Sequence, residues 1–367
     1  MDEKLRILLL LNTLDGQGRK LWAALKKGLM SPDDLWKCNP KLFTGLDLTE
    51  KAIFAVKSRI EKRWPENEIE KCMRLGIRTV CIEDEDYPVR LKDLKDPPLV
   101  LYWRGKQIRL PIRCTGVVGT RKASAYGRRI ALKIGEYCAS AGTAVISGGA
   151  SGIDGNAHRG ACISGGKTFA IFGTGADVYF PRSNEGLFEE IMECGALISE
   201  FPVGTEGEQW HFPRRNRIVA AISSKLIVVE APRKSGAMIT AGLAAELGRE
   251  VWSVPGRIDE ENASGSNRLI FDGAHPLTDL RDFFGMSETG TGASAHKNMT
   301  GRPMEELQFS LEEREILKVL RFGGGQTVDN IALEVKMSAA DILKTIAILS
   351  AKGIICSSGS GRFSVNV

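Results

Sequence analysis

Two glycine-rich turns carry the residues of this chain that are best suited to bind an anion. The first is Val118-Gly119-Thr120-Arg121, and the second begins at Ser147-Gly148-Gly149 and ends at Asp154. Each turn follows a short apolar run and opens a helical pattern, so backbone N–H groups at the start of a helix would point towards bound negative charge. The Arg121 guanidinium is placed to clamp a phosphate with two hydrogen bonds. Glycines that only permit tight turns between a strand and a helix explain either turn alone equally well.

Neither turn matches a common nucleotide-binding fingerprint, because both the G-x-G-x-x-G and the G-x-x-x-x-G-K-[ST] spacings are missing. Asp154 and His158 stand four residues apart and could act as an acid–base pair. A cap at the start of a helix and a hydrogen bond inside it explain these two residues more simply. Glu200 and Glu230 each follow an apolar run, where they could hold a ribose or a catalytic water, or accept structural hydrogen bonds.

Basic residues surround these turns. The stretch 99–135 has no Asp or Glu and nine Lys and Arg residues, and the acid-free stretch 209–229 contains Arg214, Arg215 and Arg217. The whole chain has a formal charge of only +5, so the distribution of charge, and not its total, favours a phosphate backbone as ligand. Two ordinary solvated faces would explain the charge runs, but not their coincidence with the glycine-rich turns.

The composition limits the class of protein. With 367 residues, 43% of them hydrophobic and 26% charged, the chain is expected to form two or three globular domains. No apolar run approaches the roughly 20 residues that a membrane span needs, and the short run 8–11 is expected to be the inner face of a helix. The eight cysteines form no C-x-x-C pair and have no histidine at metal spacing. We therefore expect a reduced, cytoplasmic protein that binds no metal, no cofactor and no membrane.

Strand and helix patterns alternate through the middle of the chain. Buried parallel strands are predicted at 116–119, 144–147, 169–172, 196–199, 226–229 and 251–254, with helical patterns between them. This alternation predicts an α/β fold, a doubly wound Rossmann-like parallel sheet whose ligands bind at the carboxyl ends of the strands. The proline-punctuated segment 97–105 is predicted to be an edge strand of this sheet.

Different patterns flank this central domain of residues 71–285. Residues 1–70 predict a small helical N-terminal module that resembles SAM-like or helix-hairpin-helix modules, with a turn at Gly16-Gln17-Gly18. Such hairpins usually carry an apolar residue in place of Gln17, which favours packing or protein contact over direct DNA contact. Residues 286–305 are rich in Gly, Ser, Thr and Ala and predict a flexible linker. Residues 306–367 predict three helices, the first capped by Ser310, and a hairpin, the pattern of a C-terminal winged helix.

The central motifs resemble those of a known family in kind and order. After the segment 91–105 and the two glycine-rich turns come Gly173-Thr174-Gly175, Tyr179-Phe180-Pro181, Ser199-Glu200, Phe212-Pro213-Arg214-Arg215-Asn216-Arg217, Ser235-Gly236, Val254-Pro255-Gly256 and Ser264-Gly265-Ser266-Asn267. Together they resemble the DNA-processing protein A (DprA/Smf) family over roughly residues 80–280. The resemblance implies a single-stranded DNA-binding protein of natural transformation, not an enzyme, which protects incoming DNA, forms a homodimer and loads the RecA recombinase.

The resemblance also implies roles for single residues. Arg121 would hold a phosphate beside Gly119, the turn Ser147-Gly148-Gly149 would supply backbone donors, and Phe212 would stack on a base. Arg215 and Arg217 would add charge beside Asn216, Ser235-Gly236 would close the pocket, and Arg214 would substitute for a lysine that some members carry near position 209, where this chain has Gln209. Phe212 could instead be a core residue, and Asn216 and Arg217 could simply begin a helix and pair with an acid.

Two alternatives remain from the sequence. A Rossmann-fold nucleotide-processing enzyme, similar to the phosphoribohydrolases, would carry P-G-G-x-G-T before an acid, whereas this chain has Val254-Pro255-Gly256 followed by Arg257. A pure scaffold with a vestigial pocket is the other alternative. A self-association surface is expected from the apolar stretches 238–245 and 269–271 near the end of the sheet.

Overall fold

The computed structural model describes residues 2–284, apart from 15, 40–42, 44 and 108, and residues 310–365, apart from 323–325, 336, 352–354 and 359–361. The chain forms two compact units, Met1–Glu288 and Thr289–Val367. The predicted linker, residues 286–305, lies outside the described residues.

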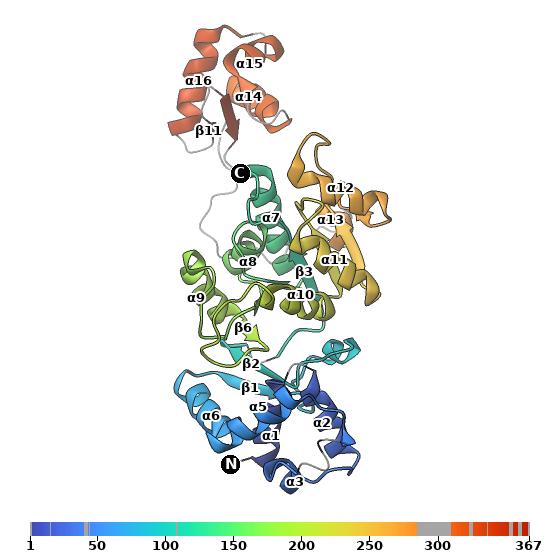
Figure 1. Ribbon diagram of the computed structural model, residues 1–367. Coiled ribbons are helices and arrows are strands. Elements are labelled where there is room, and N and C mark those ends of the chain that lie inside the picture. The colour runs from blue at the N-terminus through green and yellow to red at the C-terminus, as the bar shows by residue number, and fades with distance from the viewer. Residues whose placement is uncertain are drawn as a thin grey trace. The chain divides into compact units, whose positions relative to one another are not determined.

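A nine-stranded, mostly parallel sheet organises the first unit (Figure 1). Its order is β1-β2-β6-β5-β4-β3-β7-β8-β9, so strand order reverses on either side of β3. The seven strands from β6 to β9 are parallel, which confirms the predicted parallel α/β sheet. The strands are β1 (Arg78–Cys81), β2 (Val100–Arg104), β3 (Cys114–Val118), β4 (Ala144–Ser147), β5 (Thr168–Phe172), β6 (Ala196–Ser199), β7 (Lys225–Val228), β8 (Glu250–Ser253) and β9 (His275–Pro276).

The prediction of an edge strand at 97–105 was wrong. β2 pairs antiparallel with both β1 and β6, so it lies inside the sheet. The physical reason is the position of the prolines: Pro97 and Pro98 precede the strand and remove no donor from its ladder, while the side chains of Val100 to Trp103 are fully buried.

Helices cover both faces of this sheet because successive side chains of each strand point to opposite sides. Ile146 and Val228 pack in one core with α10 and α11, whereas Val145 and Ile227 pack in another with α7 and α8. The helices after β3 are α7 (Ala125–Ser140), α8 (Ile153–Ile163), α9 (Glu185–Cys194), α10 (His211–Ile222), α11 (Gly236–Glu246), α12 (Ser264–Phe271) and α13 (Leu280–Phe284).

The N-terminal helices share a core with the sheet. Leu8 and Leu21 pack in one cluster with Val100 and Tyr102 of β2, so the apolar core runs without a break across residue 70, where the sequence places a domain boundary. Asn12 adds polar contacts, since its side chain accepts from the backbone N–H of Leu99 at 3.0 Å. These helices are α1 (Glu3–Asn12), α2 (Gln17–Lys26), α3 (Pro32–Trp36), α5 (Glu50–Glu61) and α6 (Trp64–Arg74).

The described residues of the second unit form three helices and a small sheet. The Ser310 hydroxyl accepts from the N–H of Glu313 at 3.2 Å, and the Glu313 carboxylate accepts from the N–H of Ser310 at 2.9 Å, which is the predicted cap. The helices are α14 (Leu311–Phe322), α15 (Val328–Glu334) and α16 (Ala339–Ala351), and the strands β10 (Gln326–Thr327), β11 (Ile355–Ser358) and β12 (Arg362–Val365) pair in the order β10-β12-β11. Within the residues described, no helix has the length and apolar character that crossing a membrane requires.

Candidate functional site

A cavity of about 650 Å³ opens at the carboxyl edge of the parallel strands, beside β3. It lies where the strand order reverses, which is the usual place for a ligand in such a sheet. Of the twelve residues predicted as DNA contacts, eight line it: Gly119, Arg121, Gly148, Phe212, Arg215, Asn216, Ser235 and Gly236. Ser147, Gly149, Arg214 and Arg217 do not line it.

The two glycine-rich turns are shaped by close packing under this cavity. A Cβ on Gly119 would lie 2.5 Å from a side-chain carbon of Ile153, and one on Gly148 would lie 2.1 Å from the Arg215 guanidinium. Gly149 has a φ of +69°, in the left-handed region that favours glycine. Side chains at these positions would therefore displace the start of α8 or the Arg215 guanidinium, so the glycines have a structural role whether or not a ligand binds.

Asp154 holds the second turn closed. Its carboxylate accepts from the N–H groups of Gly148, at 3.1 Å, and Ala150, at 3.4 Å. The N–H of Gly148, one of the backbone donors that the sequence suggested for phosphate, is therefore occupied in this structure. The Ser147 hydroxyl is buried and donates to the carbonyl of Val117, so it ties β4 to β3. Burial raises the pKa of Asp154, and the positive charge of Arg215 opposes this shift.

Arg215 places a buried positive charge in the floor of the cavity. Its side chain is 5% exposed and donates a hydrogen bond to the carbonyl of Ile171, while its Nε has no hydrogen-bond partner. Burial lowers its pKa to about 10, with Asp154 acting in the opposite direction. Among the described residues, no carboxylate lies within ion-pair distance of this guanidinium. Burial disfavours this charge even with Asp154 nearby, and no carboxylate of the described residues pairs with it directly, so the cavity favours an anionic ligand.

An aromatic pair and a second arginine stand beside that charge. The rings of Phe180 and Phe212 are 5.1 Å apart, and the Arg121 guanidinium lies 5.3 Å from the centre of the Phe212 ring. Arg121 is exposed, so its remaining donors face solvent and can meet a phosphate. Phe180, which is 44% exposed, was not among the predicted site residues. The signal that could have found it is the aromatic residue in Tyr179-Phe180-Pro181, just after the strand β5.

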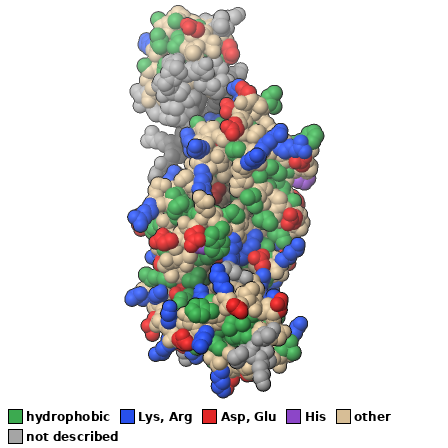
Figure 2. All heavy atoms as spheres, in the orientation of Figure 1, with side chains coloured by type: hydrophobic (Ala, Val, Ile, Leu, Met, Phe, Trp, Pro, Cys, Tyr) green, Lys and Arg blue, Asp and Glu red, His purple; other side chains and the backbone are tan. Residues whose placement is uncertain are grey.

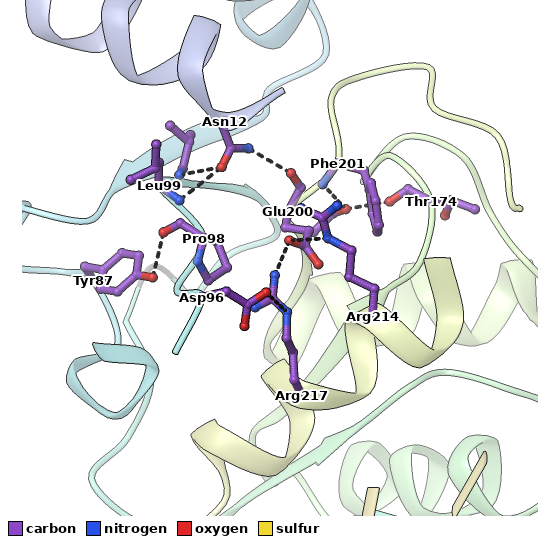
Figure 3. A network of polar contacts seen from close by, with 12 residues as sticks. Asn12, Tyr87, Asp96, Pro98, Leu99, Thr174, Glu200, Phe201, Arg214 and Arg217 are labelled. Carbon is purple, nitrogen blue, oxygen red and sulfur yellow. Dashed lines mark hydrogen bonds and ion pairs between the residues drawn. The ribbon is translucent and has the colours of Figure 1, made fainter. Parts of the chain in front are cut away.

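The other two arginines of this helix face a different set of partners. In Figure 3, Arg214 and Arg217 both point towards Glu200. Arg217 Nη2 donates to the Glu200 carboxylate at 2.5 Å and its Nε lies 3.2 Å from Asp96, while Arg214 Nε lies 3.2 Å from Glu200. The side chain of Asn12 donates to the Glu200 carbonyl at 2.9 Å and so brings α1 into the network.

The pitch of α10 explains this division. Residues 212, 215, 216 and 219 lie on the face that lines the cavity, and residues 214 and 217 lie on the face towards Glu200. Arg217 is 8% exposed, and its guanidinium forms an internal ion pair with Glu200 in place of facing the cavity. Burial raises the pKa of Glu200, and the charges of Arg217 and Arg214 oppose that shift. Glu200 is therefore an ion-pair partner in the structure, as Glu230 is an acceptor for the Ser124 N–H at 2.9 Å.

His158 lies below the site and not in it. The ring is fully buried, and its Nδ1 lies 2.6 Å from the hydroxyl of Thr168, which in turn donates to the carbonyl of Val145. It does not line the cavity. Burial lowers its pKa to about 3, which keeps the ring neutral in the folded protein and favours the structural interpretation over the acid–base pair.

The depressed pKa of His158 predicts a pH dependence of stability. Unfolded histidine takes up a proton below about pH 6.5, whereas the folded ring does not until about pH 3. The contribution of the neutral His158 ring to the free energy of unfolding is therefore fully present above pH 6.5. It declines as the pH falls, by up to about 1.4 kcal/mol per pH unit. Urea unfolding at pH 7 and at pH 5 tests this prediction. Between these pH values, the free energy of unfolding of His158→Gln should fall by about 2 kcal/mol less than that of the unchanged protein. Equal losses would show that another group controls acid sensitivity.

The sequence of this chain is similar to proteins of one known family. Residues 78–287 match the model of a family described as DNA recombination-mediator protein A. The chain is 41% identical over 199 residues to the Protein Smf of Synechocystis, covering 53% of this chain and 50% of that protein. It is 35% identical over 268 residues to the DNA processing protein DprA of Bacillus subtilis, covering 70% of this chain and 90% of that one.

Two solved structures share the fold at 28% sequence identity. The X-ray structure of DNA processing protein A from Streptococcus pneumoniae superposes with a TM-score of 0.66 and covers 79% of this chain and 99% of that one. DNA processing protein A from Helicobacter pylori, whose structure is described in terms of a single-stranded DNA binding mode, superposes with a TM-score of 0.53 over 57% of this chain and 95% of that one.

Proposed function

The chain belongs to the DNA recombination-mediator protein A family, and from this we propose that it binds single-stranded DNA in the cavity beside β3 and catalyses no reaction there. The observation that carries the proposal is the buried Arg215 guanidinium, which faces the cavity next to the aromatic pair Phe180 and Phe212. A positive charge beside aromatic rings is the usual combination for single strands, because phosphates and bases are both bound without regard to sequence.

The geometry supports a division of roles in this site. Arg121 at the mouth and Arg215 in the floor attract the phosphates, and Phe212, with Phe180 against it, stacks on a base. Asn216 and the turn Ser235-Gly236 close the cavity on the side of α11. Figure 2 shows basic and acidic side chains interspersed over one face of the molecule, so we assign specificity for the strand to the cavity and not to a uniformly basic surface.

Further roles follow from the family. We propose that the protein acts in the cytoplasm during natural transformation, protecting incoming DNA and loading RecA onto it. The described residues of the second unit form three helices and a small sheet. We propose that this unit is a winged helix, and we assign it, with the helices of residues 1–70, to contacts with proteins. RecA assembly on DNA coated with single-strand-binding protein tests the loading role: adding this protein should shorten the lag, and an unchanged lag would exclude loading.

Self-association is proposed through α12. Phe271 at the end of this helix is 78% exposed, and Ile270 beside it is partly buried. We predict that Phe271→Glu converts a dimer to a folded monomer in sedimentation at tens of micromolar. Met73→Glu, at a site on α6 that is 75% exposed, is the matched control and should leave the dimer intact. A monomeric unchanged protein would exclude the dimer outright.

A titration of the full chain tests the proposed function. Fluorescently labelled oligo-dT should bind, and AMP should remain unhydrolysed in the same preparation. Hydrolysis of AMP would favour the phosphoribohydrolase-like enzyme in place of a binding protein. If the protein neither binds oligo-dT nor hydrolyses AMP, it would be a pure scaffold with a vestigial cavity.

A further inference from the structure

Trp210 is a half-exposed aromatic side chain next to the cavity, and the proposed site leaves it without a role. It is 49% exposed and stands at the N-cap of α10. The residue before it, Gln209, and the residue two places after it, Phe212, both line the cavity. Consecutive Cα atoms are about 3.8 Å apart, so the Cα atoms of Trp210 and Phe212 lie within about 7.6 Å of each other.

The indole is held in a fixed orientation. Its Nε1 donates to the Glu208 carboxylate at 2.5 Å. Its ring lies edge-on to the buried rings of His211 and Phe201, with centroids 4.1 and 6.2 Å away, and the Arg214 guanidinium lies 5.8 Å from its centre. The Glu200 ion pair anchors Arg214 in turn. A rigid aromatic surface loses little conformational freedom when a ligand stacks on it.

The charges around Trp210 favour bases over phosphates at this point. The positive charge beside the indole, Arg214, is paired with Glu200. The loop before Trp210 carries Glu206 and Glu208, both exposed, and carboxylates repel a phosphate backbone. Arg121 and Arg215 attract phosphates at the cavity. A strand whose phosphates face those arginines would therefore turn its bases towards the loop that carries Trp210.

We propose that Trp210 is a second base-stacking platform, so that the bound single strand continues from the cavity past Gln209 and over the indole. This inference rests on the proposed function, because it extends the same DNA site. The Phe180–Phe212 pair binds one base, and Trp210 binds a base further along the strand. Oligonucleotides long enough to reach both platforms gain affinity from both, and shorter ones gain from the first alone.

Binding of labelled oligo-dT across lengths of about 4 to 16 nucleotides, measured by fluorescence anisotropy with the full chain, tests this inference. Trp210→Ala should weaken binding of the long oligonucleotides by about 5- to 150-fold, the loss of one stacked base, and should leave the shortest bound as before. Trp210→Phe should restore most of the affinity. The matched control is Phe54→Ala on α5, another exposed aromatic residue at 74% exposure, which should change nothing.

Two results would overturn the inference. Unchanged binding by Trp210→Ala at every length, while Arg121→Ala weakens it, would show that the indole stacks on no base of the bound strand. Equal weakening at every length would show that Trp210 only supports the cavity. The proposed function fails separately, when the unchanged protein binds no oligonucleotide or when Arg121→Ala has no effect.

Discussion

Arg121→Ala is expected to weaken the binding of single-stranded DNA by about 10- to 150-fold, the value of a charged hydrogen bond to a phosphate. The loss should be the same for every sequence, because a phosphate contact carries no sequence information. Arg121 also lies over the Phe212 ring, so its removal takes away one neighbour of the stacking surface. Titration of oligo-dT and of mixed sequences by anisotropy measures the effect.

The salt dependence of the same titration identifies the kind of contact. Loss of one phosphate contact should reduce the slope of log K against log salt by about 0.7. Lys62→Ala removes the same charge from an exposed position at the end of α5 and serves as the control for long-range effects. If Arg121→Ala and Lys62→Ala behave alike, the first glycine-rich turn has only a structural role and the site has been misplaced.

Glu200→Ala is expected to lower the free energy of unfolding of the first unit by about 3 kcal/mol. The substitution leaves the guanidinium of Arg217, 8% exposed, with Asp96 as its remaining ion-pair partner, and it also removes one of the partners of Arg214 (Figure 3). Removing one member of a buried ion pair costs much more than the pair contributes, because the other charge stays buried. All six tryptophans lie before residue 289, so urea unfolding followed by tryptophan fluorescence reports this unit.

Glu193→Ala provides the matched control for that measurement. Glu193 pairs with Lys106, and both side chains are 66% exposed, so its loss should cost less than about 1 kcal/mol. A similarly small loss for Glu200→Ala would mean that Asp96 and solvent satisfy Arg217. The contacts of Glu200 with Arg214, Arg217 and Asn12 would then contribute little to the packing of α10 against the N-terminal helices.

The sheet could be predicted from the sequence because its strands are buried on both faces. Such strands appear as unbroken apolar runs, and the turns after them fall at one edge whatever the detailed packing. Gly119, Arg121 and Gly148 accordingly lie at the edge that holds the cavity, as predicted. The edge-strand prediction for 97–105 failed because pairing partners are long-range, and nothing in that segment specifies that β1 will cover it.

The division of the arginines on α10 follows from helical periodicity, but the partners of these arginines could not be predicted from the sequence. Arg214, Arg215 and Arg217 are nearly adjacent in the chain, yet only Arg215 lines the cavity. Helical periodicity counted from Phe212 groups Arg215 and Asn216 with it and sets Arg214 and Arg217 apart. The partners Glu200 and Asp96 come from distant segments, so their ion pairs required the structure. Phe180 was missed for the same reason, since its contact with Phe212 is made across 32 residues.

Ultraviolet cross-linking of oligo-dT to the full chain, followed by mass spectrometric mapping of the modified peptides, tests the central claim most directly. Thymines should cross-link to the cavity, at Phe180 or Phe212, and Arg121→Ala should reduce the yield there. Cross-links confined to the second unit, Thr289–Val367, would contradict this claim, because the DNA site would then lie outside the nine-stranded sheet.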